Sequence, residues 1–216
     1  MWQVVGQDSA VSLLERSLDK KTLAHAYLLV GPPHVGKMTL ALDLAKAINC
    51  DSAAVPCGEC TSCRRIASGK HADVQIIGLA GADDPPEDRS QTEIGIDRIR
   101  HMQHSASLPP FEGRYKVFII ERAELLSNEA ANCLLKTLEE PQENVVFLLL
   151  TAREELLPAT VVSRCQRLEL FPLAVGAAES ALSSRWAVEK EKARLLARLC
   201  HGCLGRALLA APDDIW

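Results

Sequence analysis

Short apolar runs alternate with amphipathic stretches along most of the chain. The runs have the length and branched side chains of buried strands and span 26–30, 74–77, 116–120, 144–150 and 166–170. Between them, apolar positions recur at helical spacing in 9–20, 37–48, 96–105 and 128–139. Strands and helices that alternate in this way form a parallel sheet covered by helices on both faces. The last of these helices is the best marked, with Ser127 as its N-cap and Pro141 beyond its end.

The pattern changes after Pro172. From 174 to 211 the chain is rich in Ala, Leu, Arg and Glu and shows helical spacing only. We therefore predict an α/β domain at 1–172 and a small helical lid domain at 173–216. Within the first domain, the Gly-, Asp-, Pro- and Ser-rich segment 80–91 predicts an exposed loop.

Composition and charge narrow the class of protein. The 216 residues are 48% hydrophobic, which is normal for a globular chain with a core. No run of 18 apolar residues predicts a membrane span, and the N-terminus shows no basic and apolar leader, so we expect a cytoplasmic protein. The formal net charge is −4. Proteins that hold DNA by bulk charge are basic, so contact with nucleic acid should be local or made by partners.

The first apolar run leads into a glycine-rich loop, residues 31–38, with the sequence GPPHVGKM. This segment fits the G-x-x-x-x-G-K phosphate loop, in the required place between a strand and a helix. Gly31 and Gly36 let backbone N–H groups surround phosphates, and Lys37 reaches the terminal phosphates. Met38 stands where a Ser or Thr hydroxyl normally binds Mg²⁺, and a thioether is a poor ligand for that cation. Thr39 lies about 100° further round the helix and does not replace it, so we expect weak Mg²⁺ binding.

The run at 116–120 ends in a second altered position. Active P-loop ATPases place Asp-Glu here, the first for the metal and the second for the attacking water. Glu121 keeps a carboxylate, but Arg122 cannot accept a proton from water. Losing the water-activating group costs roughly 10²–10⁴-fold in rate. We predict that ATP or ADP can still bind but is not hydrolysed, and we interpret Glu124 as a solvated charge rather than a replacement base.

Four of the eight cysteines form a cluster with short spacings: Cys50, Cys57, Cys60 and Cys63. In a reducing compartment this pattern favours a metal over disulfides, and four thiolates suit tetrahedral zinc in a closed, structural site. An iron–sulfur cluster and a metal-free loop are the alternatives. We interpret His71 as a surface residue rather than a ligand. The remaining cysteines are interpreted as small buried hydrophobic residues: Cys133, Cys165, Cys200 and Cys203.

Several segments together resemble bacterial clamp-loader subunits of the ATPase type, over residues 1–172. They are Gly6-Gln7, His25-Ala26-Tyr27, the phosphate loop, the cysteine cluster, the run from Ser127 to Pro141, and Ser163-Arg164-Cys165. The resemblance implies an AAA+ fold with a zinc module at about 50–63 and a helical lid. Within this group, the altered metal positions resemble delta-prime subunits rather than gamma/tau subunits.

The resemblance also implies roles for three residues outside the phosphate loop. From the residues alone, Arg164 projects from the edge of the domain, where an arginine is usually a solvated charge. In clamp loaders, the arginine of this motif enters the ATP site of the adjacent subunit, where a guanidinium can bind the γ-phosphate. Arginines delivered in this way are worth roughly 10³–10⁵ in rate. By the same resemblance, Thr151 is the sensor-1 residue and Arg206 is the sensor-2 residue of the lid.

The partners implied are the delta and gamma/tau subunits and, through the assembly, the sliding clamp and primed DNA. The expected role is that of a non-hydrolysing subunit of the DNA polymerase III holoenzyme; the assembly, not this chain, is the DNA-directed DNA polymerase, a nucleotidyltransferase. Clamp loaders continue into a helical collar domain, which we expect to be absent because the sequence stops at Trp216. Two alternatives stay open: an active ATPase of gamma/tau type in which Glu121 holds Mg²⁺ through water, and a zinc-bearing nucleic-acid-binding module with a vestigial ATPase core.

Overall fold

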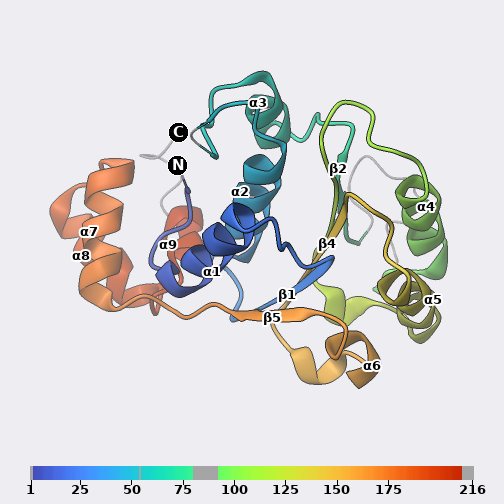
Figure 1. Ribbon diagram of the computed structural model, residues 1–216. Helices are drawn as coiled ribbons and strands as arrows, with labels where there is room; N and C mark the ends of the chain where they lie inside the picture. Colours follow the sequence, from blue (N-terminus) through green and yellow to red (C-terminus); the bar gives the residue numbers. More distant parts are fainter. Residues whose placement is uncertain (1, 54, 80–91, 211–216) are drawn as a thin grey trace.

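Five parallel strands form the centre of the molecule (Figure 1). The computed structural model describes residues 2–53, 55–79 and 92–210. The strands lie in the order β2-β3-β4-β1-β5, and every neighbouring pair is parallel. They are β1 (Ala26–Val30), β2 (Val74–Ile77), β3 (Lys116–Ile120), β4 (Val145–Thr151) and β5 (Gln166–Glu169). The parallel sheet predicted from the alternating pattern is confirmed.

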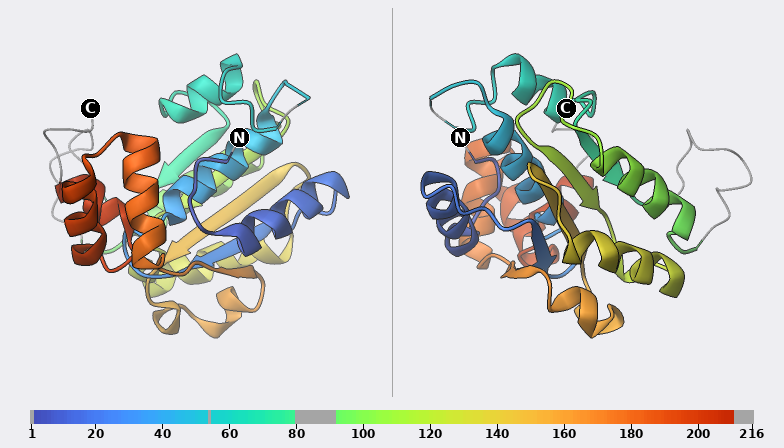
Figure 2. Two further views of the ribbon diagram at one scale, coloured as in Figure 1. Left: turned by 90° about the vertical axis from the view of Figure 1, so that its left-hand side faces the viewer. Right: turned by 45° about the vertical axis from the view of Figure 1, so that its right-hand side comes forward.

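Helices cover both faces of this sheet, as Figure 2 shows. One face carries α1 (Asp8–Asp19), α2 (Lys37–Asn49) and α3 (Thr61–Ala67), and the other carries α4 (Ile96–Ala106) and α5 (Asn128–Glu139). Side chains of β1 alternate between two apolar clusters: Tyr27 packs with Leu44 of α2, and Leu28 packs with Leu134 of α5. Because β1, β3 and β4 are buried on both faces, their sequences are continuous apolar runs.

The helices begin and end close to their predicted positions. Ser127 caps α5, since its side chain accepts a hydrogen bond from the N–H of Ala130 at 3.2 Å. The short turns η1 (Ala123–Leu125) and η2 (Glu154–Leu156) and the short helix α6 (Ala159–Val162) complete the connections on the carboxyl-terminal side of β3 and β4. The loop predicted at 80–91 lies outside the described residues. Within the described part of the chain, no helix has the length and apolar character needed to cross a membrane.

Within the described residues, the chain after β5 is helical, as the sequence predicts: it forms α7 (Val175–Trp186), α8 (Lys190–Leu199) and α9 (Leu204–Ala210). They pack around an apolar cluster of their own that includes Leu182, Ala193 and Leu196. Two backbone hydrogen bonds join them to the rest of the molecule: Leu173 N–H donates to Gly202 O at 2.9 Å, and Gly205 N–H donates to His34 O at 3.1 Å. The start of α9 therefore rests directly on the phosphate loop. The domain boundary near residue 172 stays a prediction.

Candidate nucleotide site, cysteine cluster and edge arginine

A cleft of about 940 Å³ opens beside the phosphate loop. The loop itself, residues 32–39, forms one wall. The turn after β3 supplies Glu121 and Glu124, and the helical lid supplies Trp186 and Leu204. The predicted nucleotide site is thus a concave space enclosed by three separate parts of the chain, as ligand sites usually are.

The phosphate loop has the backbone that its glycines predict. Gly36 adopts φ 110° as the N-cap of α2, a left-handed conformation that favours glycine. At Gly31 a side chain has no space, because a Cβ atom would lie 2.6 Å from the carbonyl oxygen of Leu170. Lys37 Nζ donates to the carbonyl oxygens of Gly31 at 2.5 Å and Pro32 at 2.9 Å. The lysine therefore folds back on its own loop, where phosphate oxygens would replace these two acceptors.

The charge of Lys37 depends on its surroundings. Burial lowers the pKa of Lys37, and the nearby carboxylate of Glu124 acts in the opposite direction. Both Met38 and Thr39 line the cleft, and Met38 also packs against the apolar core. Weak Mg²⁺ binding at this position stays a prediction.

The acidic side of the cleft differs from the sequence interpretation at one residue. Glu121 and Arg122 follow β3 directly and are exposed at the cleft wall. Glu124, interpreted as a solvated charge, is instead half-buried, and one of its carboxylate oxygens is fully buried with no hydrogen-bond partner among the described residues. The reason is local: the turn η1 reverses the chain after β3 and returns Glu124 to the cleft. Periodicity gave no signal for this turn.

The two proposed sensor residues have different positions. Thr151 ends β4 next to the phosphate loop, where its carbonyl accepts from Gly31 N–H at 3.2 Å and its hydroxyl accepts from Arg153 N–H at 3.0 Å. Arg206 is exposed on α9, and among the described residues that line the cleft its neighbours Leu204 and Gly205 occur but Arg206 does not. Arg153 does line the cleft, and the sequence offered no pattern that would single it out.

Arg164 lies in the turn between α6 and β5. Its Nη1 donates to the carbonyl oxygen of Thr160 at 2.8 Å, and its Nη2 donates to Glu139 Oε1 at 2.5 Å. The start of β5 pairs with the start of β1, whereas the phosphate loop follows the end of β1. Arg164 therefore lies at the amino-terminal ends of the strands, whereas the phosphate loop lies at their carboxyl-terminal ends. The two are roughly 15 Å apart, at about 3.3 Å per strand residue. Arg164 cannot act in the cleft of its own chain.

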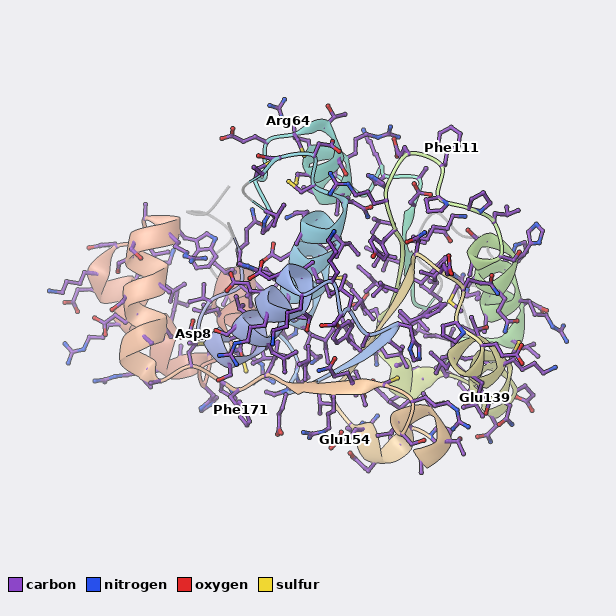
Figure 3. The ribbon with its side chains drawn as sticks, viewed as in Figure 1. Asp8, Arg64, Phe111, Glu139, Glu154 and Phe171 are labelled. Carbon is purple, nitrogen blue, oxygen red and sulfur yellow. The ribbon has the colours of Figure 1, made fainter. Side chains whose placement is uncertain are left out.

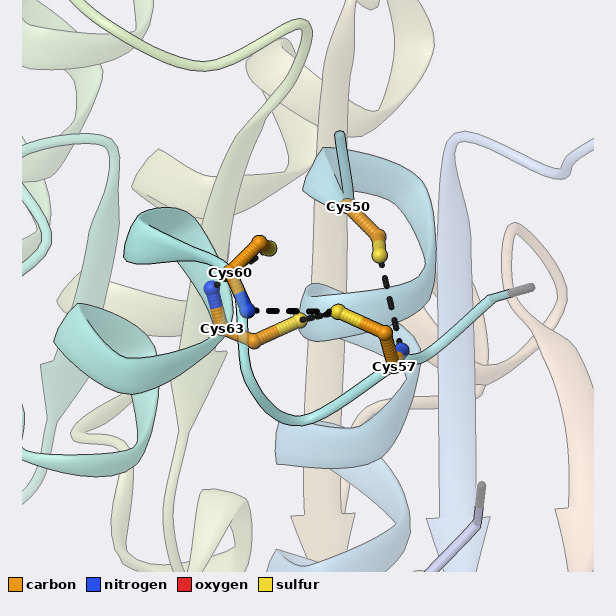
Figure 4. A group of neighbouring side chains, drawn as sticks. All are labelled: Cys50, Cys57, Cys60 and Cys63. Carbon is orange, nitrogen blue, oxygen red and sulfur yellow. Dashed lines mark hydrogen bonds between the residues drawn. The ribbon is translucent and has the colours of Figure 1, made fainter. Parts of the chain in front are cut away.

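The four clustered cysteines converge on one point, as Figure 4 shows. Their sulfur atoms all lie within 4.8 Å of one another, and the thiols of Cys50 and Cys63 are buried. Cys57 Sγ and Cys63 Sγ are 3.9 Å apart, close to the ~3.8 Å expected between thiolates held about 2.3 Å from a tetrahedral zinc ion. This spacing fits a single metal ion and leaves no space for a cluster of several irons.

Backbone N–H groups prepare the cluster for a cation. The amides of Cys60 and Glu59 donate to Cys57 Sγ at 3.3 and 3.4 Å. These bonds lower the pKa of Cys57 to about 6, whereas burial raises the pKa of Cys63 to about 12. One thiol is thus ready as a thiolate and another is ionised only when a cation compensates it. The four thiols can supply all the ligands of a tetrahedral metal ion, which leaves no coordination position open for a substrate.

His71 is not a surface residue, so that interpretation is wrong. Its side chain is buried, with Nε2 3.2 Å from Ser62 Oγ and Nδ1 accepting from Asp73 N–H at 3.2 Å. The start of α3, through Ser62, and the connection before β3, through Gly113, lie against it. Among the other cysteines, Cys200 and Cys203 are buried as predicted, while Cys133 and Cys165 are only half-buried.

Comparisons with known proteins identify the family. A family model described as DNA polymerase III, delta subunit, matches residues 6–174. The DNA polymerase III subunit tau of Escherichia coli (strain K12) is 37% identical over 98% of this chain and 32% of its own length. The subunit delta' of Bacillus subtilis (strain 168) is 35% identical over 96% of this chain and 60% of its own length.

A comparison with solved structures supports the fold described above. The Thermotoga maritima RuvB Holliday junction branch migration motor superimposes with a TM-score of 0.60 and 20% identity, over 97% of this chain and 65% of that protein. At this identity the likeness establishes the AAA+ fold alone. The chain spans less than two thirds of the length of each of these three proteins. By its match to the family model over residues 6–174, this chain belongs to the DNA polymerase III delta subunit family.

Proposed function

We propose that the chain acts as a delta-prime-type subunit that hydrolyses no ATP and supplies Arg164 to the ATP site of a neighbouring clamp-loader subunit. One observation carries this proposal. Arg164 lies at the amino-terminal ends of the strands, opposite to the end that holds the chain's own phosphate loop, and its guanidinium is partly exposed. A cation in that position can serve a nucleotide only if another subunit brings the nucleotide to it.

The residues of the chain's own cleft support the part of the proposal that says this chain hydrolyses no ATP. Met38 occupies the position of the metal-binding hydroxyl, and Arg122 occupies that of the water-activating carboxylate. The amide cradle and Lys37 remain, so ATP or ADP would bind with little help from Mg²⁺. Thr151, which lies next to the phosphate loop, would then act as sensor 1. Arg206 would act as sensor 2 only after a shift of α9 that brings its side chain to the cleft.

The assembly follows from the same proposal. The neighbours would be delta and gamma/tau subunits, and the sliding clamp and primed DNA would be reached through the ring during DNA replication. Zinc is the metal that fits the cysteine cluster best, because four thiolates at this separation suit a tetrahedral ion without redox chemistry. Its role would be structural, since all four ligand positions come from the protein.

The test reconstitutes the ring with the full-length protein carrying Arg164→Ala, with the other ATP sites silenced through their own phosphate-loop lysines. We expect clamp-stimulated ATP hydrolysis at the adjacent site to fall by roughly 10³-fold or more while the ring still assembles. Arg167→Ala is the matched control, since Arg167 is an exposed arginine three residues away that pairs with Glu154 and Glu169. An Arg164→Ala ring that hydrolyses ATP at the wild-type rate would rule out the proposal.

A second candidate function, an active ATPase of gamma/tau type, is favoured by the position of Glu124. This carboxylate reaches the cleft that also holds Lys37 and Glu121, so two acidic groups stand beside the phosphate loop. Phosphate release by the purified chain decides between the two functions. Turnover that depends on Mg²⁺ and is abolished by both Lys37→Ala and Glu124→Gln would establish the second.

A further inference from the structure

Glu139, the last residue of α5, meets Arg164 across 25 residues of sequence. Figure 3 shows Glu139 at the end of α5, beside α6. The guanidinium of Arg164 has two close acceptors from two different elements. The Thr160 carbonyl belongs to α6, just before the turn that holds Arg164, whereas the Glu139 carboxylate comes from α5. Ser163 Oγ lies further from Nη1, at 3.5 Å.

Helix stability does not explain a glutamate at this position. The C-terminal end of a helix carries a partial negative charge and favours cations over carboxylates. Glu139 and Glu140 both stand at that end of α5, and the side chain of Glu139 is 49% exposed, so burial does not explain it either. Among the residues that the structure describes, the Glu139 carboxylate accepts its side-chain hydrogen bond from Arg164.

We infer that Glu139 positions Arg164 for its action on the neighbouring nucleotide, an inference that rests on the proposed function. An arginine side chain has many rotamers, and the Thr160 carbonyl alone leaves the guanidinium free to turn about a single bond. A second acceptor on Nη2 fixes the plane of the group. Because a guanidinium has five N–H donors in a rigid fork, the donors not engaged by these acceptors, Nε–H among them, stay available for phosphate oxygens.

The carboxylate also keeps the arginine ordered before the nucleotide arrives. A charge-assisted hydrogen bond is roughly twice as strong as a neutral one, so Gln at position 139 should hold the guanidinium less firmly and Ala not at all. Pre-ordering of this kind acts on the turnover step rather than on the affinity of the neighbouring subunit for ATP. Glu139 is thus a positioning residue, acting through Arg164.

The experiment uses the ring reconstituted with the full-length protein and the other ATP sites silenced. We expect Glu139→Ala to lower kcat at the adjacent site about tenfold with little change in the KM for ATP, as misplacement of a reacting group does. Glu139→Gln should lie between Glu139→Ala and the wild type. Glu140→Ala removes the same charge one residue away and should behave as the wild type. In a ring that already carries Arg164→Ala, adding Glu139→Ala should change nothing further.

Each contrary result has a distinct meaning. A wild-type rate for Glu139→Ala, in a series where Arg164→Ala is impaired, overturns the positioning role and leaves the proposed function standing. A faster rate shows that Glu139 restrains Arg164 and equally overturns it. A further fall in the double variant shows a general structural role, which contradicts the inference. If Arg164→Ala itself has no effect, the proposed function fails and the inference fails with it.

Discussion

Two buried side chains, those of Asp73 and Asn49, accept backbone hydrogen bonds from the segment that connects α4 to β3. The carboxylate of Asp73 accepts the backbone N–H groups of Phe111, Glu112 and Gly113 at 2.7 to 2.8 Å. The amide oxygen of Asn49 accepts those of Arg114 and Tyr115 at 2.8 and 2.9 Å. Five consecutive N–H groups are thus satisfied by two side chains. Phe111, labelled in Figure 3, is held in an exposed position by this arrangement.

Asp73 should make stability depend on acidity. Burial alone would raise its pKa, but the three amide donors outweigh burial and hold the pKa below the ordinary value of 3.8. A carboxyl group whose pKa is lower in the folded state stabilises it above the unfolded pKa, and this contribution is lost as the pH falls through the folded pKa. We expect the free energy of unfolding, measured in urea, to decline below pH 3.8.

The variant Asp73→Asn tests this origin. The NH₂ group of the new asparagine would face backbone N–H donors, so the variant should lose about 1–3 kcal/mol of unfolding free energy at neutral pH. The decline of that free energy below pH 3.8 should become smaller. Asp97→Asn is the control, because Asp97 is 85% exposed and contributes little to either effect. Equal acid sensitivity of the wild type and Asp73→Asn would contradict the assignment.

At the scale of elements, local signals decide where helices begin and how the cysteine module is joined to α2. Ser127 caps α5 through a 3.2 Å hydrogen bond. Cys50 follows the end of α2, while Cys60 is the N-cap residue of α3 and accepts from Cys63 N–H. A metal ion held by the four thiols would therefore join the end of one helix to the start of the next.

The cysteine cluster should carry a bound metal ion. We expect one zinc ion per chain by atomic emission, lost in Cys57→Ser and retained in Cys200→Ser, whose thiol lies in the helical lid. A chelator should lower the melting temperature of the wild type, because metal affinity contributes to folding free energy in such sites. Iron in place of zinc, or metal retained by Cys57→Ser, would contradict this.

The N-cap of α5 should contribute measurably to stability. Ser127→Ala removes the acceptor for the Ala130 N–H and should cost about 1 kcal/mol of unfolding free energy. Ser184→Ala, an exposed serine in α7, should change stability by less than about 0.5 kcal/mol. Chemical denaturation of both variants measures the difference, and a cost no larger than that of Ser184→Ala would exclude the capping role.

At the scale of the whole molecule, the helical lid is fixed to the nucleotide cleft at several points. Gly205 N–H donates to His34 O of the phosphate loop, and Arg185 Nη1 donates to Gln3 O at 2.7 Å. Gly202 has φ 78°, and a Cβ there would lie 2.2 Å from Leu173 O and 2.7 Å from Leu173 N. Only glycine permits this approach of two backbones, so Gly202 sets how the turn before α9 packs on the segment that leads from β5 into the lid.

Gly202→Ala should loosen the lid. Left-handed strain costs a residue with a Cβ roughly 1–2 kcal/mol, and the clash with the Leu173 backbone adds to it. Gly69→Ala is the matched control, with φ 67° but open space around the new Cβ. We expect Gly202→Ala to be the less stable of the two and to expose residues 173–204 to limited proteolysis. Equal stability and equal protection would show that the backbone contact does not hold the lid.

The buried strands could be predicted because burial on both faces leaves a continuous apolar run in the sequence. The grouping of Cys50, Cys57, Cys60 and Cys63 could be predicted because their spacing in the sequence is short. The position of Glu124 could not, since a three-residue turn decides whether that carboxylate faces water or the cleft. The burial of His71 was missed because α3 and the connection before β3 approach it only after folding.

The order of residues by itself determined the strand-and-helix alternation, the phosphate loop, the altered positions Met38 and Arg122, and the four-thiol set, because each depends on neighbours within a few residues. The tertiary structure alone decided that Arg164 stands at the edge of the sheet away from its own cleft, that Glu139 meets it, and that α9 rests on the phosphate loop. These contacts join segments far apart in sequence. Their geometry follows from how the sheet and helices pack, which no local pattern encodes.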